Sequence, residues 1–183
     1  MKFGSQLKVY RAQWNEMHDQ IQAMEAGRWH SIWFPDHFLP PVPISGISAE
    51  QDELNPAYEA FIPLAVVAGM TKRLKLGSLV LGNTYRNPAL VAKMAAELDQ
   101  ASKGRFTLGI GAGWFEREHQ AYGWDFPSMK ERQDRLEEAC ALIRKLFTAE
   151  EPIDFQGQYY RLERAPLSPG CYQKPHLPIM IGG

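Results

Sequence analysis

Five short apolar runs alternate with stretches of helical periodicity along the 183 residues of this chain. Strand-like runs separated by helices form βαβ units, whose strands pair in parallel and whose crossovers are right-handed. The order therefore predicts an α/β protein with a parallel sheet, while periodicity alone leaves a doubly wound sheet and a (β/α)8 barrel both open. The expected strands cover residues 1–5, 31–34, 73–82, 105–113 and 177–183.

Capping signals mark where the helices between these strands begin and end. The first helix is expected to end at Gly27, and the last opens with a capping box at residues 128–131. Asn-Pro pairs at residues 55–56 and 87–88 each combine an N-cap with a proline in the first helical position. Because an interior proline costs a helix about 3 kcal/mol, we expect the helix after residue 56 to break near Pro63.

The charge balance and the cysteines narrow the class of protein. Twenty Lys and Arg against 21 Asp and Glu leave a formal net charge of −1, without a basic stripe, so neither nucleic acid nor a membrane surface is an expected partner. No apolar run reaches the roughly 18 residues of a membrane span. Cys140 and Cys171 lack metal or redox spacing and fit a reduced compartment. We therefore expect a cytoplasmic protein that binds a small molecule.

The segment SIWFPDHFLP, residues 31–40, places Asp36 and His37 directly after a buried strand. One interpretation is a turn in which Asp36 caps a backbone N–H group and His37 is solvated. The other is catalytic, because side chains at the carboxyl end of a barrel strand face the ligand mouth. An imidazole with an ordinary pKa near 6.5 can move a proton there at neutral pH.

The segment GIGAGWFEREHQAYG, residues 109–123, contains two motifs of low specificity. GIGAGW lacks the third glycine of a dinucleotide fingerprint, so that interpretation is weak. Glycines 109, 111 and 113 either let a flat ligand approach the backbone or allow tight packing, and the sequence leaves both open. Glu118 and His119 are adjacent and do not share a helix face, so we expect no metal site there.

Three segments together resemble one known family. Residues 31–40, 73–123 and 155–183 are similar to the bacterial luciferase-like family, within its branch of oxidoreductases that use the deazaflavin coenzyme F420. The resemblance implies a (β/α)8 barrel and hydride transfer between F420 and a small organic substrate. Two alternatives stay open: an FMN-dependent monooxygenase that incorporates molecular oxygen, and a non-catalytic half barrel that acts as a binding protein.

The resemblance also implies roles for individual residues. His37 would be the catalytic acid/base, and a bulge at Leu79–Val80, often with a non-prolyl cis peptide, would support the ring of the coenzyme. Trp114 replaces the catalytic Glu of the family's sugar-phosphate dehydrogenases, which argues against such a substrate. Thr84 is a further polar candidate, and Glu118 and His119 would make loop–helix contacts near the coenzyme. The implied cofactor-binding residues are Asp36, Leu79, Val80, Asn83, Gly111, Gly113, Gly182 and Gly183.

The length of the chain bears on its domain organisation. Complete (β/α)8 barrels need on the order of 250 residues, so residues 1–183 would form one luciferase-like domain containing about the first five βα units. We expect the sequence to be a fragment of a longer protein that forms a homodimer at full length. Residues 151–176 are expected to be a hairpin-containing insertion outside the main alternation.

Overall fold

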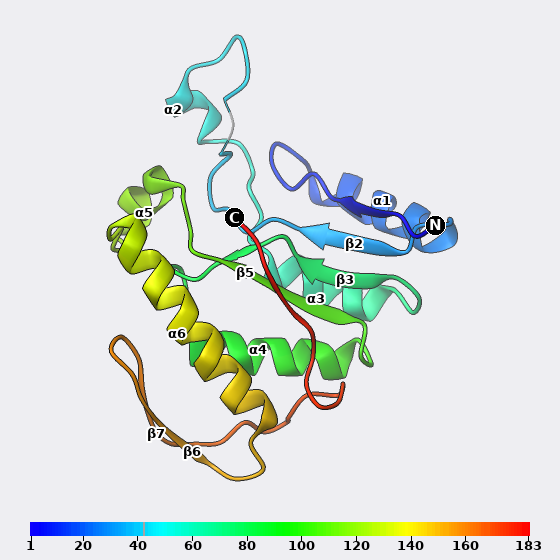
Figure 1. Ribbon diagram of the computed structural model, residues 1–183. Helices are drawn as coiled ribbons and strands as arrows, with labels where there is room; N and C mark the ends of the chain where they lie inside the picture. The colour runs from blue at the N-terminus through cyan, green and yellow to red at the C-terminus, as the bar shows by residue number, and fades with distance from the viewer. Residues whose placement is uncertain (42) are drawn as a thin grey trace.

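The computed structural model describes residues 1–41 and 43–183, and its centre is a six-stranded parallel sheet (Figure 1). The strand order β1-β2-β3-β5 follows the chain, β4 continues the line of β3 along the same edge of β5, and β8 pairs with the opposite edge of β5. A doubly wound sheet reverses its order at a switch point, whereas this order runs on in one direction, as in a barrel wall. The strands are β1 (Gly4–Gln6), β2 (Ser31–Phe34), β3 (Lys75–Ser78), β4 (Leu81–Gly82), β5 (Phe106–Gly111) and β8 (Ile179–Ile181).

The helices divide into long ones that cover the sheet and short ones at the strand ends. Strand residues such as Ile32, Leu76 and Leu108 are fully buried in the core shared with the long helices. The expected helix end at Gly27 and the expected helix start at residues 87–88 are both found. The long helices are α1 (Trp14–Ala26), α3 (Phe61–Met70), α4 (Pro88–Ala101) and α6 (Met129–Thr148), and the short ones are α2 (Ala49–Asp52) and α5 (Glu116–Tyr122).

The start of α3 differs from the sequence expectation. The helix expected to begin at residues 55–56 does not begin there. Ala57 instead pairs with Tyr10 in an isolated antiparallel bridge, which is incompatible with a helix at this position. The helix begins instead at Phe61, where the Glu59 carboxylate accepts the first two helical N–H groups. Pro63 therefore lies in the first turn, where a missing N–H group breaks no helical hydrogen bond. The break expected near Pro63 does not occur.

The long third strand expected at residues 73–82 is divided into β3 and β4. The Leu79–Val80 peptide between them is cis, as the resemblance implied. The N–H group of Leu79 donates to the carbonyl of Phe34, at 2.7 Å, so the interruption lies beside the end of β2. The chain thus changes direction at the carboxyl end of the sheet, next to the loop that carries residues 36 and 37.

The hairpin expected within residues 151–176 is present. Strands β6 (Ile153–Gln156) and β7 (Arg161–Ala165) pair in antiparallel fashion outside the parallel sheet. The Glu138 carboxylate on α6 accepts the backbone N–H groups of residues 158–160 at 2.7–2.9 Å, which fixes the turn against the helix. The assignment of residues 151–176 as an insertion stays a prediction.

Strand β8 is less buried than its apolar sequence indicated. We expected a buried fifth strand, but Ile179 and Met180 are half-buried and Ile181 is exposed. Among the described residues β8 pairs only with β5, so one of its edges has no strand beside it. Within residues 1–41 and 43–183, no helix has the length and apolar character needed to cross a membrane.

Candidate active site

His37 lies just beyond the end of β2, in the loop over the carboxyl ends of the strands. Its side chain is 13% exposed. The ring Nδ1 faces the carboxylate of Glu118, at 3.0 Å from Oε2 and 3.2 Å from Oε1. The rings of Tyr10, Trp114 and Phe115 meet the imidazole edge-on, with centroids 5.6–6.1 Å away. The predicted acid/base is therefore held in one orientation.

Glu118 is the centre of this cluster, and its side chain is completely buried. Besides His37 Nδ1, its carboxylate accepts the backbone N–H groups of Phe38 at 2.5 Å and Leu39 at 2.9 Å, and the hydroxyl of Tyr85 at 2.6 Å. Burial by itself raises the pKa of Glu118. The hydrogen bond and the charge of His37, followed by the hydrogen bonds from the Tyr85 hydroxyl and the Leu39 N–H group, outweigh burial and lower the pKa. A carboxylate held in this way requires a proton on Nδ1 of His37 and leaves Nε2 as the reactive nitrogen.

Tyr10 and Tyr85 also belong to this cluster, and both are neutral phenols. Burial raises the pKa of Tyr10, and the negative charges of Glu118 and Asp36 raise it further. Burial also raises the pKa of Tyr85, which donates its hydroxyl hydrogen to Glu118. Neither hydroxyl is able to act as a base at neutral pH. Because both phenols stay neutral, the Glu118 carboxylate is the negatively charged group beside His37.

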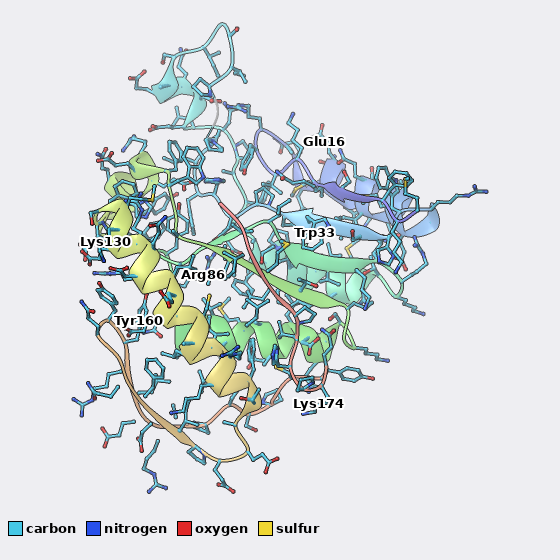
Figure 2. The ribbon with its side chains drawn as sticks, viewed as in Figure 1. Glu16, Trp33, Arg86, Lys130, Tyr160 and Lys174 are labelled. Carbon is cyan, nitrogen blue, oxygen red and sulfur yellow. The ribbon has the colours of Figure 1, made fainter. Side chains whose placement is uncertain are left out.

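Asp36 belongs to a different network from its neighbour His37. Its buried carboxylate binds the guanidinium of Arg86 through two hydrogen bonds, at 2.7 Å and 3.0 Å (Arg86 is labelled in Figure 2). The same carboxylate accepts the N–H groups of Gly82, at 3.1 Å, and Ala60, at 3.2 Å. Arg86 also binds Glu59 at 2.6 Å. Both oxygens of Asp36 are thus engaged by protein donors that join β4 and α3 to the loop after β2.

Val80, which follows the cis peptide, packs between two of the predicted glycines. A Cβ atom on Gly111 would lie 2.4 Å from the carbonyl oxygen of Gly182 and 2.9 Å from Val80 Cγ2. A Cβ atom on Gly182 would lie 2.7 Å from Val80 Cγ1. The glycines therefore allow the bulge, β5 and β8 to pack closely, which is the packing interpretation of the motif. The N–H group of Gly182 donates to the carbonyl oxygen of Ile110. The N–H group of Gly183 is the other donor of the predicted phosphate-binding turn.

Asn83 and Gly113 lie on the side of the site nearest the hairpin and α5. The Asn83 amide donates to the hydroxyl of Tyr160 at 3.1 Å (Tyr160 is labelled in Figure 2). The Oδ1 atom of Asn83 is buried without a hydrogen-bond partner among the described residues. Gly113 has a φ of +80°, and a Cβ atom there would lie 2.6 Å from Oγ1 of Thr84. His119 binds the same hydroxyl at 2.8 Å. The Asn83 side chain is thus anchored to the hairpin through Tyr160.

Three large apolar side chains remain exposed around the carboxyl ends of the strands: Leu79 after β3, Trp114 after β5 and Ile181 in β8. Trp114 lies against His37, with ring centroids 5.6 Å apart. Exposed apolar surface beside a fixed polar group is typical of ligand sites, and it fits a flat, aromatic ligand. The structure brings His37, Leu79, Val80, Gly111 and Gly182 together at these ends.

Sequence reasoning missed the role of Glu118, which it placed only in general loop–helix contacts. His37 and Glu118 are separated by 81 positions, and no local pattern links them. An acidic residue in a segment rich in aromatic residues was the available signal, because a carboxylate in such surroundings needs donors. Among the described residues, no group of three or more His, Cys, Asp and Glu side chains is placed to hold a metal ion. The expectation that Glu118 and His119 form no metal pair stays a prediction.

The chain is similar in sequence to proteins of one known family. The whole chain, residues 1–183, matches the model of a family described as luciferase-like monooxygenase. An F420-dependent glucose-6-phosphate dehydrogenase of Amycolatopsis mediterranei (strain U-32) is 36% identical over 162 residues, which cover 88% of this chain and 44% of the relative. One of the same name from Kineococcus radiotolerans (strain ATCC BAA-149 / DSM 14245 / SRS30216) is 39% identical over 162 residues, 88% of this chain and 43% of that protein. The chain thus spans less than half the length of these curated relatives.

Solved structures show the same architecture. An F420-dependent secondary alcohol dehydrogenase in complex with an F420-acetone adduct superimposes with a TM-score of 0.86 at 24% identity, covering all of this chain and 52% of that one. The F420-dependent tetrahydromethanopterin reductase of Methanopyrus kandleri gives 0.77 at 21% identity and covers 100% of this chain and 50% of its own. At such low identity the likeness concerns the fold alone. The predicted (β/α)8 barrel of luciferase-like type is confirmed, and this chain forms about half of one.

Proposed function

Because the chain belongs to the luciferase-like monooxygenase family, we propose that the protein is an oxidoreductase that exchanges a hydride between coenzyme F420 and a small organic substrate. Curated relatives named as F420-dependent dehydrogenases, 36% and 39% identical, support this proposal. The observation that carries it within the structure is the pairing of His37 Nδ1 with the buried Glu118 at the carboxyl ends of the strands.

The side chains at the strand ends fit a deazaflavin. When bound, F420 supplies a carbon centre that accepts or donates a hydride. Leu79, Val80 and Ile181 would hold the ring through apolar contact, since Leu79 and Ile181 are exposed there without a covering group among the described residues. The N–H group of Gly183 would contact the phosphate, while the N–H group of Gly182 is bound to the carbonyl of Ile110. Asp36 would act indirectly, by fixing the loop that carries His37.

His37 performs the proton transfer in this proposal. Glu118 holds the proton of Nδ1, so the lone pair of Nε2 takes a proton from a substrate hydroxyl or, once protonated, returns one to a carbonyl oxygen. Tyr10, Trp114 and Phe115 pack edge-on against the ring, which leaves its side chain 13% exposed. The fixed orientation removes the entropic cost of aligning the imidazole at the moment of transfer.

A titration of the purified protein with F420 and, separately, with FMN tests the proposal. We expect saturable binding of F420, measured by the change in coenzyme fluorescence, and much weaker binding of FMN. Binding of FMN without F420 would contradict the proposal and favour a monooxygenase that uses molecular oxygen. Binding of neither by a folded, defined oligomer would favour a non-catalytic binding protein.

The proposal also covers the oligomeric state and the cellular location of the protein. The protein is expected to act on its small-molecule substrate as a cytoplasmic homodimer. Light scattering coupled to size-exclusion chromatography measures the mass of the particle directly. A mass equal to that of one chain at micromolar concentration would contradict the dimer, and the proposed chemistry would be unaffected by it.

A further inference from the structure

Tyr85 lies three positions after the end of β4, in the loop that leads to α4. Its N–H group donates to the carbonyl oxygen of Gly82 at 3.2 Å, so the chain makes a tight turn there. A Cβ atom on Gly82 would lie 2.4 Å from Cε2 of the Tyr85 ring. The absence of a side chain at Gly82 therefore makes the room in which the Tyr85 ring lies.

Aromatic side chains from two other segments hold this ring in place. Phe38, in the loop after β2, meets the Tyr85 ring edge-on with centroids 5.2 Å apart. The rings of His119, on α5, and Trp124, two positions after α5, each lie 5.0 Å from it. Because these contacts come from distant parts of the sequence, they fix the plane of the phenol and with it the position of the hydroxyl oxygen.

The hydroxyl of Tyr85 donates to the same oxygen of Glu118 that lies nearer to His37. Oε1 of Glu118 accepts the backbone N–H groups of Phe38 and Leu39. Oε2 accepts the Tyr85 hydroxyl at 2.6 Å and lies 3.0 Å from Nδ1 of His37. Two donors therefore share the negative charge of one oxygen atom, so a change in the hydrogen bond from Tyr85 alters the hydrogen bond from His37.

The other ionisable groups near the imidazole are neutral or already paired. Tyr10 is a neutral phenol, because burial and the nearby negative charges raise its pKa. Asp36 is bound by the guanidinium of Arg86 through two hydrogen bonds. Among the described residues, neither Tyr10 nor Asp36 donates a hydrogen bond to Oε2 of Glu118, which receives its second hydrogen bond from Tyr85.

From this geometry we infer that Tyr85 is a positioning residue for the proton transfer at His37, and that it acts through the Glu118 carboxylate. The inference rests on the proposed function, because the hydrogen bond at Nδ1 affects catalysis only if Nε2 transfers a proton. The bond from Tyr85 draws negative charge from Oε2 and so limits the attraction of Oε2 for the imidazole. Without the hydroxyl, Oε2 binds the Nδ1 proton more strongly and stabilises the protonated ring, so His37 keeps its second proton to a higher pH.

Proton–nitrogen NMR of the purified protein without coenzyme tests the inference with Tyr85→Phe, which removes the hydroxyl and keeps the ring. We expect the Nδ1 proton signal of His37 to move downfield, and the midpoint of the ring titration to rise by roughly half a pH unit. The matched control is Tyr122→Phe, because Tyr122 packs against the same Phe38 ring while its hydroxyl faces the Phe38 carbonyl oxygen at 3.5 Å. Unchanged His37 signals in Tyr85→Phe, or equal changes in both variants, would overturn the inference.

Two further measurements keep the test decisive if Tyr85→Phe does not fold. With 3-fluorotyrosine in place of Tyr85, the hydroxyl remains and is a stronger donor, so the titration midpoint of His37 should fall; a rise or no change would contradict the inference. In a Glu118→Gln protein the same replacement should leave the His37 titration unaltered, because the coupling passes through the carboxylate. A shift as large as in the wild-type background would exclude that route.

The proposed function is tested apart from this inference, because the NMR measurements need no coenzyme. Failure of F420 to bind would overturn the proposed function, on which the inference depends, whatever the His37 signals show. Saturable F420 binding with His37 signals that do not respond to position 85 would overturn the inference and leave the proposed function standing.

Discussion

Asp36 and His37 are neighbours in the sequence, yet they belong to networks of opposite kind. The Asp36 carboxylate is fully buried and engaged by four donors, including the guanidinium of Arg86. His37 keeps part of its ring exposed and has one nitrogen committed to Glu118. The hydrogen bonds of Asp36 fix the loop, whereas His37 keeps Nε2 available for reaction. One dipeptide therefore supplies both the anchor and the chemistry, and substitutions are able to separate the two roles.

The largest effect on activity is expected at His37. Loss of a positioned acid/base costs roughly 10²–10⁴-fold in rate, so His37→Ala should lower kcat by about 10³-fold. Steady-state kinetics with F420 checks this, and the melting temperature is measured beside it, because the substitution also removes a hydrogen bond from the buried Glu118 carboxylate. His18→Ala removes an exposed imidazole on α1 and should leave kcat unchanged. A retained kcat in His37→Ala would remove His37 from the mechanism.

The largest effect on stability is expected at Asp36. Removing one partner of a buried ion pair destabilises a protein by about 3–5 kcal/mol, and the lower end of this range is expected here because Arg86 keeps Glu59 as a second partner. Asp36→Asn should lower the free energy of unfolding by an amount in this range, measured by urea denaturation. Asp19→Asn, at an exposed position, is the control with no expected change. If Asp36→Asn unfolds like the wild type but loses turnover as His37→Ala does, the division of roles is wrong.

A smaller loss of activity is expected from Glu118→Gln. The amide keeps an oxygen for the backbone N–H groups of residues 38 and 39, but its NH₂ group faces Nδ1 of His37 and favours the wrong tautomer. By analogy with the orienting carboxylate of a catalytic triad, kcat should fall by roughly 10²-fold or more. The KM for F420 should be unchanged, because Glu118 is buried behind His37. A raised KM with full kcat would indicate a structural role only.

The smallest effect is a change in acid stability. The folded-state pKa of Glu118 lies below the usual value of 4.5, so its stabilising contribution is present above that pH and is lost as the pH falls through the folded pKa. The stability difference between the wild type and Glu118→Gln should therefore shrink as the pH falls below 4.5. Urea unfolding at pH 7 and pH 3.5 measures it. A difference that grows on acidification would contradict the assigned charge.

The sequence predicted the alternation of strands and helices because both periodicities are local. It also predicted that His37 directly follows a strand, since the apolar run and the proline that ends it lie within residues 31–37. It did not predict the start of α3, because the bridge between Tyr10 and Ala57 joins distant segments and keeps residues near 57 extended. The same limit applies to the site: the partners of residues 36 and 37, Arg86 and Glu118, lie 50 and 81 positions away.

The glycines of residues 109–113 show a further limit. The sequence indicated that side chains must be absent there, and the structure agrees. Which neighbour requires the space was not predictable, because the side chain of Val80, between β3 and β4, and the carbonyl of Gly182, just after β8, approach Gly111 from distant parts of the sequence. Residue type is therefore informative about the space that a position allows, whereas the identity of the neighbour depends on the tertiary fold.

The protonation of the His37 ring tests the central claim most directly. Proton–nitrogen NMR of the imidazole at neutral pH distinguishes the two neutral tautomers and reports on ligands near each nitrogen. With Glu118 bound to Nδ1, the neutral ring should carry its proton there, and addition of F420 should shift the Nε2 signal. A proton on Nε2 of the neutral ring, or no shift on saturation with F420, would show that His37 is not the acid/base that this geometry assigns.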